Sequence, residues 1–185
     1  DWDESLAMAE LAVADGMQTI ICTPHQLGNH RQNLAVDIRE RVRHLDTLLR
    51  QQGIPLRVLP GADVRVEPDL SARLQADEVL TLADRGRHVL LELPHELYLP
   101  LEPILDALRG WGIQGILSHP ERNRGILRQP SLLSPLVAAG CLMQVTAGSL
   151  LGTFGPSVQQ LAQTILREGR CHFLATDAHG ATARR

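Results

Sequence analysis

The stretch HVLLELPHELYLPLEPILDALRGWGIQGILS, residues 88–118, contains two short apolar runs separated by an amphipathic segment. HVLLEL and QGILS are each predicted to be a strand, because a short, continuous apolar run is typical of a buried strand in a parallel sheet. The segment LEPILDALRGWG has apolar residues at helical spacing, and its Pro103 is tolerated only in the first turn of a helix. The stretch therefore predicts a strand–helix–strand unit with parallel strands.

The same alternation continues on both sides of this unit. Further strands are expected at MQTIICT, LRVL, CLMQVT and CHFLAT. Helices are expected at residues 1–16, 34–53, 68–75, 130–140 and 155–169. Alternation over the whole chain favours an α/β fold, either a closed barrel or a doubly wound sheet.

Composition excludes several classes of protein. The 185 residues suffice for about one domain, and the formal net charge of −3 comes with no basic stripe, so nucleic-acid binding is not expected. No apolar run approaches the roughly 20 residues that span a bilayer. No signal peptide is recognised, and the three cysteines, Cys22, Cys141 and Cys171, are far apart and odd in number. These features predict a cytoplasmic protein with reduced, buried thiols.

Both ends of the chain look cut. It opens with Asp1 and goes directly into a helix, and it stops at Arg185 just after a polar cluster. We therefore expect a fragment of a longer protein.

Polar residues follow the expected strands at their carboxyl ends. Five of the six strands carry a histidine or a carboxylate there, and these residues are His25, Asp63, Glu92, His119, Asp177 and His179. Because the carboxyl ends of parallel strands meet at one edge, these side chains are expected to converge.

Such a group of imidazoles and carboxylates is predicted to bind metal, since a divalent cation removes the repulsion between buried carboxylates. Nitrogen and oxygen ligands without thiolates favour Mn²⁺, Fe or Zn²⁺. More than four ligands indicates more than one metal, an arrangement typical of phosphoester hydrolysis. Arg122, close behind His119, is the first candidate to bind a phosphate, and Arg184 is the second.

Structural explanations compete with this hypothesis. A single histidine at a strand end is more often a hydrogen-bonded structural residue, and Asp63 alone could cap the turn before PDLSARLQ. Glu92 at the end of a buried strand is harder to explain in this way, because a buried carboxylate needs a partner. The recurrence of such residues favours a metal site. His95 is a weaker candidate for the same site, and Arg124 is expected on the surface.

A covalent nucleophile is not favoured. Cysteine phosphatases need an arginine six residues after the cysteine, and the three cysteines have Gly28, Ala147 and Asp177 there. Neither a G-x-S-x-G elbow nor a P-loop is present. A metal-activated water is therefore the preferred nucleophile.

The motifs TIICTPH, VLPGADVRV, LLELP, SHPERN and TDAH, followed by Arg184, resemble in order and spacing the PHP (polymerase and histidinol phosphatase) superfamily. The closest likeness is to the metal-dependent bacterial protein-tyrosine phosphatases encoded with capsule and exopolysaccharide synthesis genes. The resemblance covers nearly the whole chain, and HPERN and the terminal DAH…R are its most specific parts.

The resemblance implies a distorted (β/α)₇ barrel with up to three metal ions, Mn first and Fe or Zn as alternatives. His25 and His179 would serve one metal, Glu92 and His119 a second, and Asp177 a third. Asp63 would bridge two metals, while Arg122 and Arg184 would hold the phosphate. The implied substrate is phosphotyrosine on the tail of an autophosphorylating polysaccharide-synthesis kinase.

The chain departs from this family pattern in two ways. The family begins with a strand carrying His-x-His and an acidic residue, and this chain starts after that point and also stops before the family's C-terminal helical segment. We therefore expect residues 1–185 to be a single catalytic domain, truncated at both ends, whose barrel lacks its first strand. The bridging position is usually Glu, whereas Asp63 is one methylene shorter, which would draw the metals toward that strand or weaken one site.

Three hypotheses about function remain open. The first is a phosphotyrosine-protein phosphatase, and the second is a phosphatase of a small phosphomonoester such as histidinol phosphate. The third is a catalytically incomplete domain that binds a partner. The sequence does not give the oligomeric state.

Overall fold

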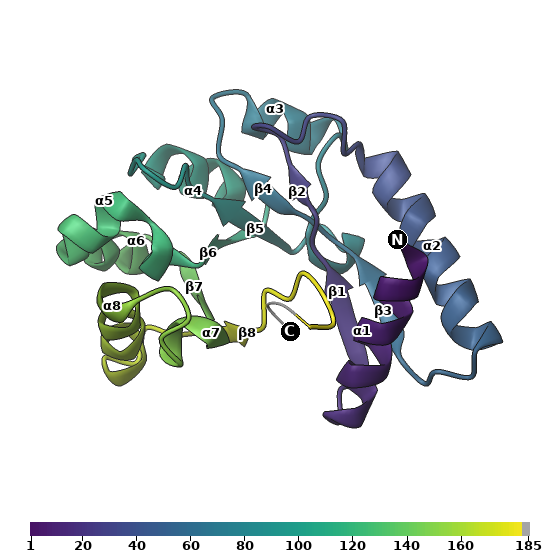
Figure 1. The fold of residues 1–185 in the computed structure, drawn as a ribbon. Helices are drawn as coiled ribbons and strands as arrows, with labels where there is room; N and C mark the ends of the chain where they lie inside the picture. Colours follow the sequence, from purple (N-terminus) through teal and green to yellow (C-terminus); the bar gives the residue numbers. More distant parts are fainter. Residues whose placement is uncertain (183–185) are drawn as a thin grey trace.

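The computed structural model describes residues 1–182, which form a curved array of parallel strands with helices on its outer side (Figure 1). Within these residues, one sheet has the order β2-β4-β5-β6-β7-β8 and a second has the order β1-β3. The strands are β1 (Thr19–Cys22), β2 (His25–Gln26), β3 (Arg57–Pro60), β4 (Asp63–Arg65), β5 (His88–Glu92), β6 (Gln114–Ser118), β7 (Leu142–Thr146) and β8 (Phe173–Ala175). Every strand pair is parallel, so the predicted α/β fold with parallel strands is confirmed.

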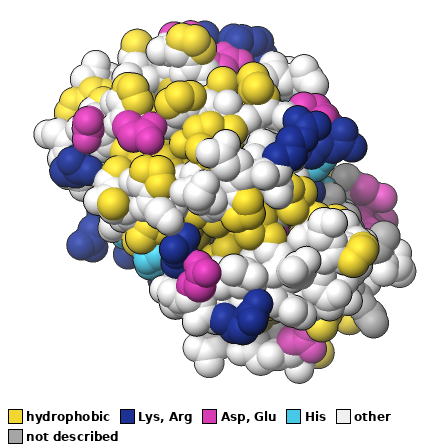
Figure 2. All heavy atoms as spheres, turned by 90° about the vertical axis from the view of Figure 1, so that its left-hand side faces the viewer, with side chains coloured by type: hydrophobic (Ala, Val, Ile, Leu, Met, Phe, Trp, Pro, Cys, Tyr) yellow, Lys and Arg dark blue, Asp and Glu magenta, His cyan; other side chains and the backbone are white. Residues whose placement is uncertain are grey.

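The helices cover the outer side of this array (Figure 1). The α-helices are α1 (Trp2–Ala14), α2 (Ala35–Gln51), α3 (Leu70–Gln75), α4 (Glu102–Gly110), α5 (Arg124–Arg128), α6 (Leu133–Ala138), α7 (Ala147–Leu150) and α8 (Pro156–Arg167). Single 3₁₀ turns are η1 (Leu82–Asp84), η2 (Pro120–Arg122) and η3 (Pro130–Leu132). Positive and negative side chains are mixed on the face shown in Figure 2, which is covered by the helices on the left of Figure 1, and the basic ones form no stripe there.

The unit at residues 88–118 shows how the core is built. Strands β5 and β6 pair in parallel from His88 and Gln114 onward, and α4 packs across them. Leu105 and Leu108 of α4 are buried, and a Cβ at Gly115 of β6 would lie only 2.7 Å from Cδ2 of Leu105. The helix therefore approaches the sheet closely because residue 115 has no side chain.

The chain bends after two of the predicted strands and enters a further short strand each time. After β1 the chain turns at Pro24 and continues as β2, and after β3 it turns at Gly61 and continues as β4. A Cβ at Gly61 would lie 2.8 Å from Cγ2 of Ile21, so the bend needs glycine. His25 and Asp63, predicted to follow strands, come after β1 and β3, and each is also the first residue of the short strand beyond the bend.

Other predicted boundaries also differ. The helix predicted from Pro68 begins at Leu70, and Leu34 precedes α2 and is 52% exposed rather than buried. The helix predicted over 130–140 is divided into η3 and α6, and the short helices α5 and α7 were not predicted. Only Cys141 of the three cysteines is buried, whereas Cys22 and Cys171 are partly exposed, and all three are free thiols.

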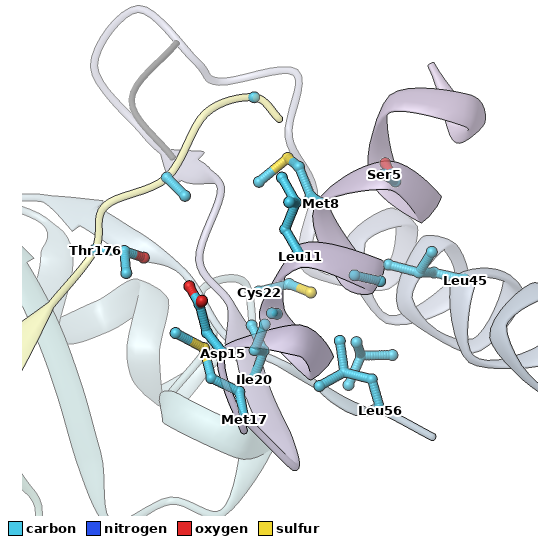
Figure 3. Close-up of a pocket in the computed structure, with 15 residues that line it drawn as sticks. Ser5, Met8, Leu11, Asp15, Met17, Ile20, Cys22, Leu45, Leu56 and Thr176 are labelled. Atoms are coloured by element: carbon cyan, nitrogen blue, oxygen red, sulfur yellow. The ribbon is translucent and has the colours of Figure 1, made fainter. Parts of the chain in front are cut away.

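The strands described here do not close into a barrel, because β1 and β8 pair on one side only. A hollow of about 540 Å³ lies between α1, β1 and the segment after β8 (Figure 3). It is lined mostly by apolar side chains, including Met8, Leu11 and Ile20. Within residues 1–182, none of the helices has the length and apolar character needed to cross a membrane.

Candidate metal centre

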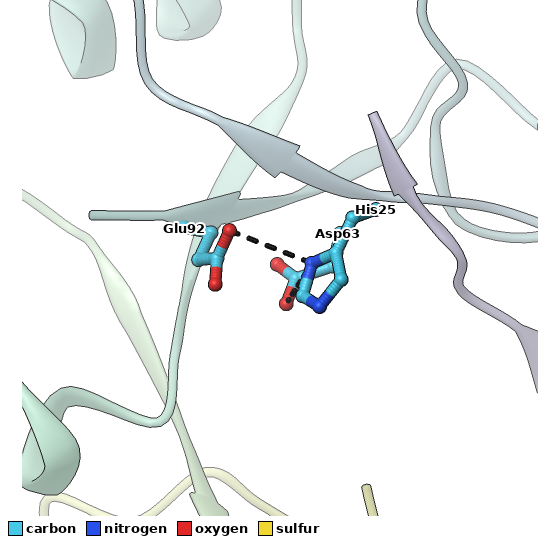
Figure 4. A group of neighbouring side chains, drawn as sticks. All are labelled: His25, Asp63 and Glu92. Carbon is cyan, nitrogen blue, oxygen red and sulfur yellow. Dashed lines mark ion pairs between the residues drawn. The ribbon is translucent and has the colours of Figure 1, made fainter. Parts of the chain in front are cut away.

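Four of the predicted site residues lie together: His25 and Asp63 begin β2 and β4, Glu92 ends β5, and His119 follows β6. Nδ1 of His25 is 3.7 Å from Oδ2 of Asp63 and 3.5 Å from Oε2 of Glu92 (Figure 4). Nε2 of His119 is 3.6 Å from Oδ2 of Asp63 and 3.8 Å from Oε1 of Glu92. The two imidazoles thus face the same pair of carboxylates.

The register of the strands produces this convergence. His25 of β2 pairs with Asp63 of β4, and Asp63 pairs with Leu90 of β5. Side chains alternate along a strand, so Glu92, two residues after Leu90, points to the same side of the sheet as Asp63.

His119 reaches the group through an unusual backbone conformation. It follows β6 directly and has φ 35° and ψ 55°, in the left-handed region, immediately before Pro120 and η2. This conformation costs a residue with a Cβ roughly 1 kcal/mol, and such strain is concentrated at functional sites. Asp177 also has a positive φ, of 52°. Two of the predicted site residues are therefore held in strained conformations by the chain around them.

The electrostatics of the group favour an ionised Glu92 carboxylate. Asp63 is 4% exposed and Glu92 is 9% exposed. Interaction with the Glu92 carboxylate raises the pKa of His25 above its ordinary value and outweighs the opposing effect of burial. Burial acts to raise the pKa of Glu92, but its interactions with His25, Arg65 and His119 outweigh burial and hold that pKa below the ordinary value.

The donor atoms of this group fit a divalent cation. His25, Asp63 and Glu92 each offer a ligand atom, and these atoms lie within 4.8 Å of one another. Nδ1 of His25 and Oδ1 of Asp63 are buried and make no hydrogen bond within the described part of the chain. Buried polar atoms without partners are costly, and a shared cation would satisfy both. Nitrogen and oxygen donors of this kind suit Mn²⁺, Fe and Zn²⁺.

Neighbouring side chains hold the two carboxylates in place. The hydroxyl of Ser118 donates to Oδ2 of Asp63 at 3.1 Å, and Nε of Arg65 donates to Oε2 of Glu92 at 3.1 Å. Arg65 was not identified from the sequence. Asp63 and Arg65 are alternate residues of β4 and share one face of the sheet, so the alternation in DVR was the available signal.

The remaining predicted residues form a second group beside the first. Nη1 of Arg122 donates to Oδ2 of Asp177 at 2.5 Å. His179 Nδ1 lies 2.8 Å from the carbonyl oxygen of Asp177, and the His179 ring centroid is 6.4 Å from that of His25. Arg184 lies outside the described residues.

Arg122 lines one cavity together with two members of the first group, Glu92 and His119. A small hollow of about 40 Å³ is lined by residues that include Glu92, His95, His119 and Arg122. His95 therefore lies at the site, as the weaker sequence hypothesis allowed. The proximity of Arg122 gives a cationic group beside the carboxylates, which is the combination that an anionic substrate needs.

Further neighbours of the site had no clear signal in the sequence. The ring of His30 stacks on that of His25 with centroids 5.1 Å apart, and Cζ of Arg122 lies 4.4 Å from the centroid of the Phe154 ring. Glu121 was assigned no role from the sequence, and its Oε1 accepts hydrogen bonds from Thr146 N and Ser149 Oγ. Apart from the stack of His25 and His30, these contacts join residues far apart in the chain, so sequence spacing does not reveal them.

Comparison with known families matches residues 1–185 to the family described as capsular polysaccharide synthesis, CpsB/CapC. The chain belongs to the CpsB/CapC family. Tyrosine-protein phosphatase YwqE of Bacillus subtilis (strain 168) is 36% identical over 186 residues, which cover 100% of this chain and 72% of that protein. CapC of Staphylococcus aureus is 27% identical over 183 residues, covering 98% of this chain and 71% of that protein.

The fold of this CpsB/CapC member is also similar to that of a solved structure. That structure comes from work on YwqE from Bacillus subtilis and CpsB from Streptococcus pneumoniae, described as unique metal-dependent tyrosine phosphatases. The TM-score is 0.94 at 35% sequence identity, and the match covers 100% of this chain and 75% of that chain. The likeness thus extends over the whole described array of strands and helices.

Proposed function

We propose that this CpsB/CapC member is a metal-dependent protein-tyrosine phosphatase. The observation that carries the proposal is the pair of buried carboxylates, Asp63 and Glu92, faced by His25 and His119 and lying beside Arg122. A cation site next to an arginine suits a phosphomonoester, which needs both metal ligation and a guanidinium partner. The names of the YwqE and CpsB relatives support tyrosine phosphate as the substrate.

Each side chain of the site has a proposed role. His25, Asp63, Glu92, His119, Asp177 and His179 would hold the metal ions. Asp63 and Glu92 are kept in position by Ser118 and Arg65, so the ligands do not have to reorient when a cation binds. Arg122 would bind the phosphate and stabilise the negative charge that develops on it. Arg184 is proposed as the second phosphate-binding arginine.

Divalent cations held by these carboxylates and imidazoles would supply charge neutralisation and Lewis-acid chemistry for phosphate hydrolysis. Arg122, held on one edge by Asp177, presents a fixed cation toward the same cavity. The preferred cation is Mn²⁺, with Fe or Zn²⁺ as alternatives, in a centre of up to three ions.

The proposal extends to the architecture. We infer a distorted (β/α)₇ barrel of the PHP type, with residues 1–185 as one catalytic domain. The apolar hollow between β1 and the segment after β8 supports this inference, because β1 and β8 have free edges within the described sheets. A further strand between them would pair with both edges and cover the apolar side chains.

We propose a bacterial tyrosine kinase of polysaccharide synthesis as the phosphotyrosine-bearing substrate, and the cytoplasm as the place of the reaction. Membership of a capsular polysaccharide synthesis family supports this partner.

The experiment compares the full-length, metal-loaded protein on a phosphotyrosine peptide and on histidinol phosphate. We expect a higher kcat/KM for the peptide, and we expect Arg122→Ala to reduce it by about 10²–10³-fold without loss of fold. A preference for histidinol phosphate would replace the proposed substrate class. Absence of hydrolysis of either compound, with metal bound, would leave the binding-domain hypothesis instead.

A further inference from the structure

We propose that Phe154 and Glu121 are positioning residues that fix the guanidinium of Arg122. This inference rests on the proposed function in so far as Arg122 is taken to bind phosphate. It assigns a role to the turn after β7, which contributes none of the predicted metal ligands, and to the acid of the HPERN motif.

Phe154 supports one face of the guanidinium. Cζ of Arg122 lies 4.4 Å from the centroid of the Phe154 ring, within the range of a cation–π contact. On one edge of the guanidinium, Nη1 of Arg122 donates to Oδ2 of Asp177. The side chain of Arg122 is only 18% exposed. A planar cation supported on one face and bonded on one edge has few orientations left.

The turn that carries Phe154 is itself held rigidly. It follows α7, where Thr153 N donates to the carbonyl of Gly148 at 3.0 Å and Gly155 N donates to that of Gly152 at 3.0 Å. A Cβ at Gly148 would lie 3.5 Å from Cε2 of Phe154, so the ring packs directly against the backbone of α7. The position of the ring therefore follows the position of α7.

Glu121 ties α7 to the backbone of the arginine. Its side chain is 0% exposed, and Oε1 accepts hydrogen bonds from Thr146 N at 3.0 Å and Ser149 Oγ at 2.7 Å. Both donors belong to the end of β7 and to α7, and both bond Oε1, whereas Oε2 is buried and makes no hydrogen bond within the described residues. Glu121 precedes Arg122 in the chain, so this bond fixes the distance between the arginine and the turn.

The two contacts form a closed path. It runs from the Arg122 backbone through the Glu121 carboxylate to α7, along the turn to Phe154, and from that ring back to the Arg122 guanidinium. Both ends of the arginine side chain are thereby held by one segment. Loss of either contact frees the guanidinium without removing a predicted metal ligand.

The test uses the full-length, metal-loaded protein with Phe154→Leu, Phe154→Tyr, Glu121→Gln and Glu121→Ala. Leu151→Ala is the matched control, because Leu151 lies in the same turn and is 83% exposed. Three quantities are measured: the affinity for inorganic phosphate by calorimetry, kcat and KM on a phosphotyrosine peptide, and the NMR shift of the Arg122 Hε proton. The NMR measurement uses Zn²⁺-loaded protein, because paramagnetic Mn²⁺ would broaden signals near the site. Metal content and melting temperature are recorded for each variant.

Phe154→Leu is expected to weaken phosphate binding and raise KM by about 5- to 30-fold with metal content unchanged, since it removes the cation–π contact. It is also expected to move the Arg122 Hε signal, which the ring current of Phe154 displaces. Phe154→Tyr keeps the aromatic ring, and Glu121→Gln keeps the Oε1 acceptor. Both variants are expected to have a phosphate affinity and a KM near those of the wild type. Glu121→Ala should weaken phosphate binding and raise KM to about the same extent as Phe154→Leu. In an Arg122→Lys background, Phe154→Leu should cause no further change in phosphate affinity or KM.

A Phe154→Leu protein that binds phosphate as tightly as the Leu151→Ala control, with an unmoved Hε signal, would overturn the inference. Wild-type protein that fails to hydrolyse the peptide would overturn the proposed function alone, because phosphate affinity and the Hε signal still report the positioning of Arg122. The Phe154 variants also keep the test decisive if Glu121→Ala does not fold.

Discussion

At the scale of single residues, His119 shows how the chain creates a site at a strand end. Its left-handed backbone turns the chain sharply after β6 and brings the imidazole to Asp63 and Glu92. The hydrogen bond from His119 N to the carbonyl of Gln144, at 2.9 Å, holds this turn against β7. The strained conformation is thus supported by the neighbouring strand.

We predict that His119→Ala reduces phosphatase activity by at least about 10²-fold and lowers the metal content, while the fold is retained. The reason is that one of the four converging ligands is lost but the backbone of the turn keeps its hydrogen bond. Activity, metal content by mass spectrometry and circular dichroism provide the measurements. His88→Ala is the control, since His88 begins β5 at the opposite edge of the sheet. Full activity in the His119 variant would contradict the metal assignment.

Cys141 illustrates a side chain whose chemistry is suppressed by burial. It is 1% exposed, and burial raises the pKa of its thiol to about 12. Because the pKa is raised, the thiol stays neutral at pH 8, where only about one thiol in 10⁴ would be ionised.

We predict that Cys141 reacts with a thiol-specific reagent at least about 100-fold more slowly in the folded protein than in urea at pH 8. Peptide mass spectrometry identifies the labelled cysteine. Equal labelling rates in the folded and unfolded protein would show that Cys141 is accessible.

At the scale of elements, the unit formed by β5, α4 and β6 depends on the close approach at Gly115. A Cβ there would lie 2.7 Å from Cδ2 of Leu105 and 3.1 Å from Cδ1 of Leu91. The space between helix and sheet is therefore already filled.

We predict that Gly115→Ala lowers the free energy of unfolding by about 1–3 kcal/mol, because the added methyl group overpacks the core. The matched control is Gly110→Ala at the end of α4, where a Cβ would meet nothing within 4 Å. The free energy of unfolding of this control is expected to be within about 0.5 kcal/mol of the wild-type value, or slightly higher. Urea unfolding of the three proteins measures the difference, and equal stability of both variants would contradict this account of the packing.

The long elements could be predicted from the sequence because each carries a clear pattern. Strands β5 and β6 are buried on nearly every residue, so they read as continuous apolar runs, and α2 and α8 show apolar residues at helical spacing. Strands β2 and β4 have two and three residues, and α7 has four. Elements this short have no periodicity and are determined by contacts with neighbouring elements, so the sequence did not reveal them.

The residues of the candidate site also divide into those that could be predicted from the sequence and those that could not. Residues directly at the carboxyl ends of strands, such as Glu92 and His119, could be found because parallel strands share one edge. Arg65, Phe154 and Glu121 could not be assigned by that reasoning, because each acts on a partner from another strand or turn.

At the scale of the whole molecule, the site depends on the complete array of strands. Its candidate residues extend from His25 in β2 to His179 in the segment after β8. That segment returns to α1, where Ala181 N donates to Oε1 of Glu4 at 2.6 Å. The first helix and the last described residues are therefore in contact.

The central claim is that hydrolysis of phosphotyrosine requires metal held at this site. The most direct measurement is the rate of phosphate release from a phosphotyrosine peptide by the full-length protein, before and after chelation and again after Mn²⁺ is added. We predict that chelation removes at least about 99% of the activity and that Mn²⁺ restores it, because buried carboxylates and imidazoles without a cation provide no activated water. Phosphate release that is unchanged by complete removal of metal would contradict the account.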